Sequence, residues 1–125
     1  MSSNKTKILV VDDLTVILEH FKWYFERRNF EVLTVASAEE ALPIIKENNP
    51  DIILLDINLP KMSGIDLLKL VRKFNQTVKV IMVSGYNLDA ATEALFQELG
   101  VLQFIPKPVE LSELELTIKK ALTLI

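Results

Sequence analysis

Five short apolar runs, separated by longer amphipathic stretches, constrain this chain more than any other feature. The runs are mostly β-branched and apolar on consecutive positions, which is typical of strands covered on both faces. They lie at residues 7–11, 31–36, 51–56, 78–84 and 101–105. Strands that alternate with helices predict a parallel sheet with helices on both sides, and right-handed crossovers make a doubly wound α/β domain the expected topology.

The stretches between the runs predict five helices. Apolar residues recur at three- and four-residue steps over 14–25 and 111–125, and further helices are expected over 64–74 and 88–99. The remaining helix begins at Ser37, which can form a capping box with Glu40. Pro43 lacks an N–H and is expected to kink or weaken that helix. Gly100 is expected to terminate the fourth helix.

Composition limits the classes of function. A length of 125 residues with 50% hydrophobic content predicts one domain, over residues 1–125. A net charge of -3 argues against direct nucleic-acid binding by this domain. The absence of cysteine excludes disulfides and thiolate sites, and His20 is the sole histidine, expected as a solvated helix residue. The apolar run after the polar start is too short for a signal peptide or a membrane span, so we expect a cytoplasmic protein without membrane association.

Polar side chains stand where the predicted strands end. Asp12 and Asp13 follow the first strand, Asp56 ends the third, Ser84 ends the fourth, and Lys107 follows the fifth. In sheets of this type, ligands bind beyond the carboxyl ends of the strands. An aspartate after a strand is commonly a turn or cap residue. The five together, however, predict a polar site at one edge of the sheet.

The three carboxylates at this edge need compensating charge. Two unit charges 4 Å apart repel by about 4 kcal/mol at an effective dielectric near 20. Lys107 supplies one positive charge, and an all-oxygen ligand set favours Mg²⁺ as the cofactor. A calcium loop, a Walker motif and a "GxGxxG" motif are all absent from the sequence. A carboxylate beside Mg²⁺, lysine and a hydroxyl is equipped for phosphoryl transfer from a carrier other than a cradled nucleotide.

Four motifs carry a close resemblance to a known family. "ILVVDD", "DIILLDINLPKMSG", "VIMVSGY" and "FIPKPV" occur in this order across nearly the whole chain. With them the sequence resembles the receiver domain of two-component response regulators, of the kind found in chemotaxis regulators. The resemblance implies a flavodoxin-like sheet of five parallel strands in the order 2-1-3-4-5.

The resemblance also implies roles for the residues at the strand ends. Asp56 resembles the phosphoacceptor. Asp12 and Asp13 resemble the acidic pair that holds Mg²⁺ together with Asp56 and the backbone carbonyl of Asn58. Lys107 resembles the counter-charge of the phosphoryl group.

The same resemblance implies a switch. Ser84 resembles the hydroxyl that contacts the phosphoryl group, although threonine is commoner there, and Phe104 resembles the aromatic residue that turns inward as this hydroxyl moves. From the strand pattern alone Phe104 is better explained as a core residue, and the resemblance reverses that preference. The Lys107–Pro108 peptide bond is expected to be cis. The loop after the phosphoacceptor is expected to be shaped by Pro60 and Gly64.

The expected function is a phosphorylation-dependent switch rather than a conventional enzyme. The implied donor is a histidine kinase or a histidine phosphotransfer domain, and the domain would catalyse only its own phosphorylation and slow dephosphorylation. The implied output is a partner or output domain bound through the fourth helix, fifth strand and fifth helix, and a phosphorylation-dependent homodimer is a further possibility. Two alternatives remain: an aspartyl-phosphate phosphatase, which typically has an acid where this chain has Asn58, and an interaction module that is not phosphorylated.

Overall fold

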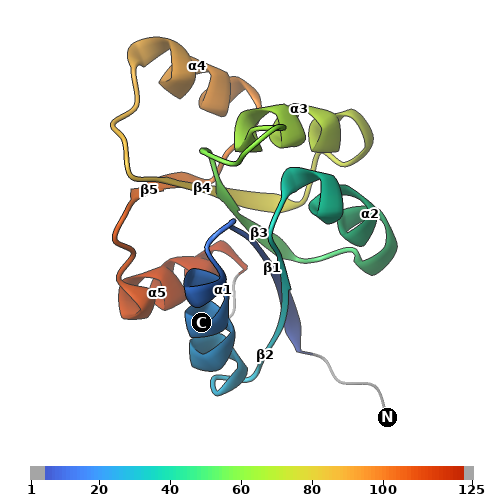
Figure 1. Ribbon diagram of the computed structural model, residues 1–125, viewed down its shortest axis with the longest axis vertical. Coiled ribbons are helices and arrows are strands. Elements are labelled where there is room, and N and C mark those ends of the chain that lie inside the picture. Colours follow the sequence, from blue (N-terminus) through green and yellow to red (C-terminus); the bar gives the residue numbers. More distant parts are fainter. Residues whose placement is uncertain (1–4, 123–125) are drawn as a thin grey trace.

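The computed structural model describes residues 5–122 and contains one parallel sheet between two layers of helices (Figure 1). The strands are β1 (Thr6–Val11), β2 (Phe30–Val35), β3 (Ile52–Asp56), β4 (Lys79–Ser84) and β5 (Gln103–Pro106). The helices are α1 (Thr15–Glu26), α2 (Ala38–Asn48), α3 (Gly64–Phe74), α4 (Ala90–Glu98) and α5 (Leu111–Ala121). The strands are ordered β2-β1-β3-β4-β5 and pair in parallel, as predicted.

Each face of the sheet has its own core, because successive side chains of a strand point to opposite faces. On β1, Ile8 and Val10 pack in the core beneath α1 and α5, whereas Leu9 and Val11 pack in the core beneath α2, α3 and α4. Figure 1 shows the same division, with α1 and α5 on one side of the sheet and the other three helices on the opposite side. Burial on both faces explains why these strands read as continuous apolar runs.

The main differences from the predicted boundaries lie at the ends of elements. The strand β5 begins at Gln103, two residues later than predicted, and its residues are half-buried or exposed because it is an edge strand. The helix α4 begins two residues later than predicted, since the Asp89 carboxylate accepts a hydrogen bond from Thr92 N at 2.7 Å and caps the helix. Leu14, predicted to lie in the apolar stripe of the first helix, precedes α1 and is 50% exposed.

The second helix begins as predicted and continues through its proline. Ser37 Oγ accepts a hydrogen bond from Glu40 N at 3.1 Å. Pro43 lies inside α2, which continues to Asn48, so the proline does not end the helix. Gly100 follows α4 with a φ of 69°, as expected of a residue that terminates a helix.

The last predicted positions of the fifth helix, 123–125, lie outside the described residues. Within residues 5–122, every helix is too short or too polar to cross a bilayer.

Candidate functional site

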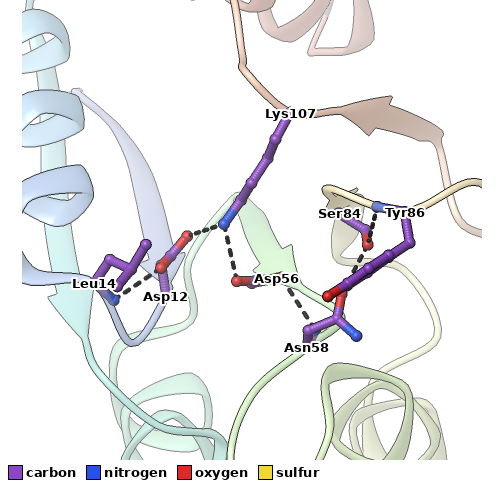
Figure 2. Close-up of polar contacts among 7 residues, drawn as sticks. All are labelled: Asp12, Leu14, Asp56, Asn58, Ser84, Tyr86 and Lys107. Carbon is purple, nitrogen blue, oxygen red and sulfur yellow. Dashed lines mark hydrogen bonds and ion pairs between the residues drawn. The ribbon is translucent and has the colours of Figure 1, made fainter.

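The polar residues at the strand ends meet at the carboxyl edge of the sheet, as the topology predicts. Asp12 directly follows β1, Asp56 is the last residue of β3, and Ser84 is the last residue of β4. Asp12, Asp56 and Ser84 are the polar residues that the structure describes as buried, with 4%, 5% and 2% of their surface exposed. Figure 2 shows Lys107 reaching down to both aspartates from the segment after β5. Residues from four strand ends therefore form one site.

Lys107 bridges the two buried aspartates. Its ammonium nitrogen lies 3.0 Å from Asp12 Oδ2 and 3.0 Å from Asp56 Oδ2. Burial alone would lower the pKa of Lys107, but hydrogen bonds and charge attraction from Asp12 and then Asp56 outweigh it and raise the pKa above its ordinary value. Lys107 is thus held as a cation between two carboxylates.

The second oxygen of each buried aspartate is bound to backbone. Asp12 Oδ1 accepts a hydrogen bond from Leu14 N at 2.9 Å, and Asp56 Oδ1 accepts one from Asn58 N at 3.0 Å. In the part of the chain that the structure describes, no buried side-chain nitrogen or oxygen lacks a partner. These bonds fix the orientation of both carboxylates and lower the cost of burying them.

The carboxylates also fit a divalent cation. Oxygen atoms of Asp12, Asp13 and Asp56 lie within 4.8 Å of one another. Asp13 is exposed, so water can complete a coordination shell there. Oxygen ligands with several retained waters are the coordination that Mg²⁺ prefers. The carboxylate oxygens are therefore compatible with the predicted Mg²⁺. The single positive charge of Lys107 neutralises only part of the negative charge of the three carboxylates.

The hydroxyl of Ser84 forms the other side of the site. Ser84 Oγ donates a hydrogen bond to Asn58 Oδ1 at 2.8 Å and accepts one from Tyr86 N at 3.1 Å. From the sequence, only the backbone carbonyl of Asn58 is expected at the site, so the contact of its side chain was missed. No sequence pattern signals it, because the contact depends on the rotamers of a residue at the end of β4 and a residue in the loop after β3.

The loops around the site contain the predicted turn residues. A Cβ atom at Gly64 would lie 2.2 Å from the backbone oxygen of Asp56, so only glycine fits this position without a shift. Pro60, at an exposed position, belongs to the same loop between Asp56 and α3. The Lys107–Pro108 peptide bond, expected to be cis, is cis.

Phe104 lies on the same face of the sheet as Ser84. In the register of β4 and β5, Met82 pairs with Phe104 and Ser84 pairs with Pro106. Alternate residues share a face, so Ser84, Met82 and Phe104 point to the same side. Phe104 is half-buried and packs against the core beneath α2, α3 and α4.

A cavity of about 460 Å³ adjoins the site. Asp12, Asp56 and Lys107 supply charged groups to its lining, and most of the remaining lining is apolar. His20 of α1 also lines the cavity, although it is exposed to solvent as predicted. The position of His20 beside the site was not predicted from the sequence, because the packing that brings α1 next to the strand ends is a property of the fold.

A five-stranded parallel sheet in the order 2-1-3-4-5, with an acidic site at its carboxyl edge, places this chain in the class of flavodoxin-like α/β domains, and the sequence comparison identifies the family. Residues 8–119 match the model of the response regulator receiver domain. The chain therefore belongs to the response regulator receiver family and is the receiver domain of a two-component system.

Curated relatives agree with this assignment. The chain is 34% identical over 119 residues to sporulation initiation phosphotransferase F of Bacillus subtilis, covering 94% of each sequence. It is 33% identical over 119 residues to the regulatory protein AtoC of Escherichia coli, covering 94% of this chain but only 25% of AtoC. Among these relatives the matching region is thus nearly the whole of one protein and a quarter of the other.

Solved structures share the fold. A CheY-like receiver domain protein from Methanospirillum hungatei JF-1 superimposes with a TM-score of 0.90 at 35% identity, covering 96% of this chain and 95% of that chain. A receiver domain protein from Clostridium thermocellum superimposes with a TM-score of 0.86 at 34% identity, covering 94% of both chains.

Proposed function

We propose that this receiver domain is a switch operated by phosphorylation of Asp56. The observation that supports this most strongly is the buried Asp56 carboxylate, which shares Lys107 with Asp12 at 3.0 Å and lies beside a third carboxylate. Burying a charge costs free energy, so a buried carboxylate is readily explained when a function requires it. Within the receiver family, an acceptor carboxylate with a fixed cation is equipment for phosphoryl transfer.

The proposed donor is a phosphohistidine on a histidine kinase or a histidine phosphotransfer protein. An oxygen of Asp56 forms a bond to phosphorus while the phosphorus–nitrogen bond breaks, and the histidine, which carries a proton on its other ring nitrogen, leaves as a neutral imidazole that retains the bonding electron pair. Asp12, Asp13, Asp56 and the Asn58 carbonyl would hold Mg²⁺, which would neutralise charge on the phosphoryl oxygens. Lys107 would also contact the phosphoryl oxygens, and it keeps its positive charge because its pKa is raised. One relative is itself named a phosphotransferase, which fits transfer chemistry.

The proposed output surface is the face formed by α4, β5 and α5 around Phe104. Ser84 and Phe104 point to the same side of adjacent strands, so a shift of the hydroxyl toward Asp56 changes the space available to the ring. Leu102, directly before β5, and Leu116 of α5 are 41% and 56% exposed. A downstream protein, an output domain or a second copy of this chain would bind there.

Phosphorylation can be tested by mass. The protein is incubated with Mg²⁺ and acetyl phosphate, and its intact mass and the release of phosphate are measured. We expect one phosphoryl group to be gained by the wild type and none by Asp56→Asn. Phosphate release over many turnovers would instead identify a phosphatase, which the amide of Asn58 in place of an acid argues against. If the mass changes neither with acetyl phosphate nor with histidine-phosphorylated donors, the domain is an interaction module that is not phosphorylated.

A further inference from the structure

The hydrogen bond between Ser84 and Asn58 has a consequence for how the switch is set. Ser84 Oγ is buried and lies between two partners, with Asn58 Oδ1 accepting its proton at 2.8 Å and Tyr86 N donating to it at 3.1 Å (Figure 2). Asn58 is held in place by its own N–H, which donates to Asp56 Oδ1 at 3.0 Å. The acceptor carboxylate, the Asn58 amide and the hydroxyl are therefore linked in one chain of contacts.

A serine hydroxyl has a single proton to donate. When Ser84 donates it to Asn58, the proton is not available to an oxygen of a phosphoryl group on Asp56. The hydrogen bond from Tyr86 N uses a lone pair and does not conflict with either arrangement. Contact with the phosphoryl group thus requires that the bond to Asn58 be broken.

We infer that the Asn58 side chain is a latch that holds the Ser84 hydroxyl away from the phosphorylated position. This inference rests on the proposed function and adds a positioning residue to it. Asn58 is exposed, so water replaces the hydroxyl at its Oδ1 when the bond breaks, and the latch is weak. A net hydrogen bond of this kind shifts an equilibrium by about two- to tenfold. It biases the switch toward the unphosphorylated arrangement without locking it.

Beryllium fluoride with Mg²⁺, a tetrahedral mimic of a phosphoryl group on a carboxylate, is a direct probe. Its dissociation constant is measured by following amide NMR signals in the wild type, Asn58→Ala, Ser84→Ala and the double variant. We expect Asn58→Ala to tighten binding about two- to tenfold when Ser84 is present. In the Ser84→Ala background the same substitution should change nothing, because there is no hydroxyl left to release. The backbone carbonyl proposed to hold Mg²⁺ is kept in every variant.

Asn87→Ala is the matched control, since Asn87 is an exposed asparagine of the neighbouring loop. Its affinity should equal that of the wild type, and an equal gain there would overturn the latch. An unchanged affinity in Asn58→Ala would also overturn it, while tight binding to the wild type would leave the proposed function standing. The same gain with and without the Ser84 hydroxyl would show that Asn58 acts directly on the bound group. Failure of the wild type both to bind the probe and to be phosphorylated would overturn the function and the latch together.

Discussion

Two loops border the proposed acceptor site, and they differ in how closely they pack on the rest of the molecule. The β3–α3 loop, residues 57–63, folds closely onto the strand end, with Gly64 N donating to Ile57 O at 3.0 Å. A Cβ at Gly64 would lie 2.2 Å from the Asp56 backbone oxygen. The β4–α4 loop, residues 85–89, is open, since a Cβ at Gly85 would meet no described atom within 4 Å and Tyr86 is 71% exposed.

The helices that follow these loops also differ in how many side chains they bury in the core. The helix α3 contributes Leu67, Leu68 and Val71 to the core, whereas α4 contributes Phe96. Segments with few buried contacts open at low free energy, and mobile functional elements are drawn from them. The Asp56 carboxylate therefore belongs to the rigid side of the site, and the Ser84 hydroxyl lies at the edge of the adaptable side. Transfer chemistry needs a fixed acceptor, while a signal needs an element that can move.

The largest expected effect is a difference in stability between alanine substitutions at Gly64 and at Gly85. Gly64→Ala should lower the free energy of unfolding by about 2–4 kcal/mol, because the new Cβ would force the Asp56 backbone to shift. Gly85→Ala should change it by less than about 1 kcal/mol, since the site is open and alanine lowers the entropy of the unfolded chain. Urea denaturation of both variants measures the difference. Equal losses would show that the two loops are equally constrained.

Lys107→Met tests how much the charge of Lys107 contributes to the stability of the rigid side of the site. Without divalent cations, we expect a loss of about 1–3 kcal/mol at pH 7, because two buried carboxylates lose the ammonium they share; water that reaches Lys107 reduces the loss below that of a fully buried pair. Added Mg²⁺ should restore part of it.

The pH dependence of this loss has a defined sign. The pKa of Lys107 is raised in the folded protein, since the attraction of Asp12 and Asp56 outweighs burial. Its contribution is therefore complete below the ordinary value of 10.5 and disappears as the pH rises through the folded-state pKa. The stability difference between wild type and Lys107→Met, followed by urea denaturation, should be constant from pH 7 to about pH 10 and narrow above it. A difference that widens above pH 10 would contradict the ion pairs.

Asp13→Asn should have a smaller effect on stability, through the same group of carboxylates. Removing one of three neighbouring carboxylates relieves repulsion, so the metal-free variant should be more stable than the wild type by about 0.5–1 kcal/mol. Mg²⁺ at ten times its dissociation constant should stabilise the wild type by about 1.4 kcal/mol and the variant much less. Thermal melts with and without Mg²⁺ measure both, and Glu98→Gln, an exposed acid at the end of α4, is the control. A variant that is less stable but still responds to Mg²⁺ would refute the proposed site.

The sequence predicts the rigid parts of this molecule better than the adaptable parts. The run at 51–56 predicts β3 to within one residue, because burial on both faces leaves an uninterrupted apolar pattern. The predicted starts of the strand β5 and the helix α4 are each two residues too early. The strand is a partly exposed edge strand, and the helix contributes little to the core. Where few side chains are buried, the apolar pattern that marks an element is weak.

The same limit applies to the site. That Asp12, Asp56 and Ser84 lie at one edge follows from strand order and from the rule that parallel strands end together. That Ser84 donates its proton to Asn58 does not follow, because it depends on the side-chain orientations of a strand-end residue and a loop residue. Sequence therefore predicts which groups meet, and the structure adds which of them are hydrogen-bonded to one another.

Ser84→Thr is the smallest change and tests the adaptable side alone. Threonine keeps the hydroxyl and adds a methyl group at a position that is 2% exposed, so the free energy of unfolding should change by about 0.8 kcal/mol or less. The stiffer β-branched side chain should restrict the hydroxyl and slow amide hydrogen exchange in residues 85–88. Exchange at Asn58 and Leu59 should stay as in the wild type, because the β3–α3 loop is held by its own contacts. Slower exchange in both loops would mean that the two loops move as one unit, so that Asp56 and Ser84 would not lie on a rigid and an adaptable side of the site.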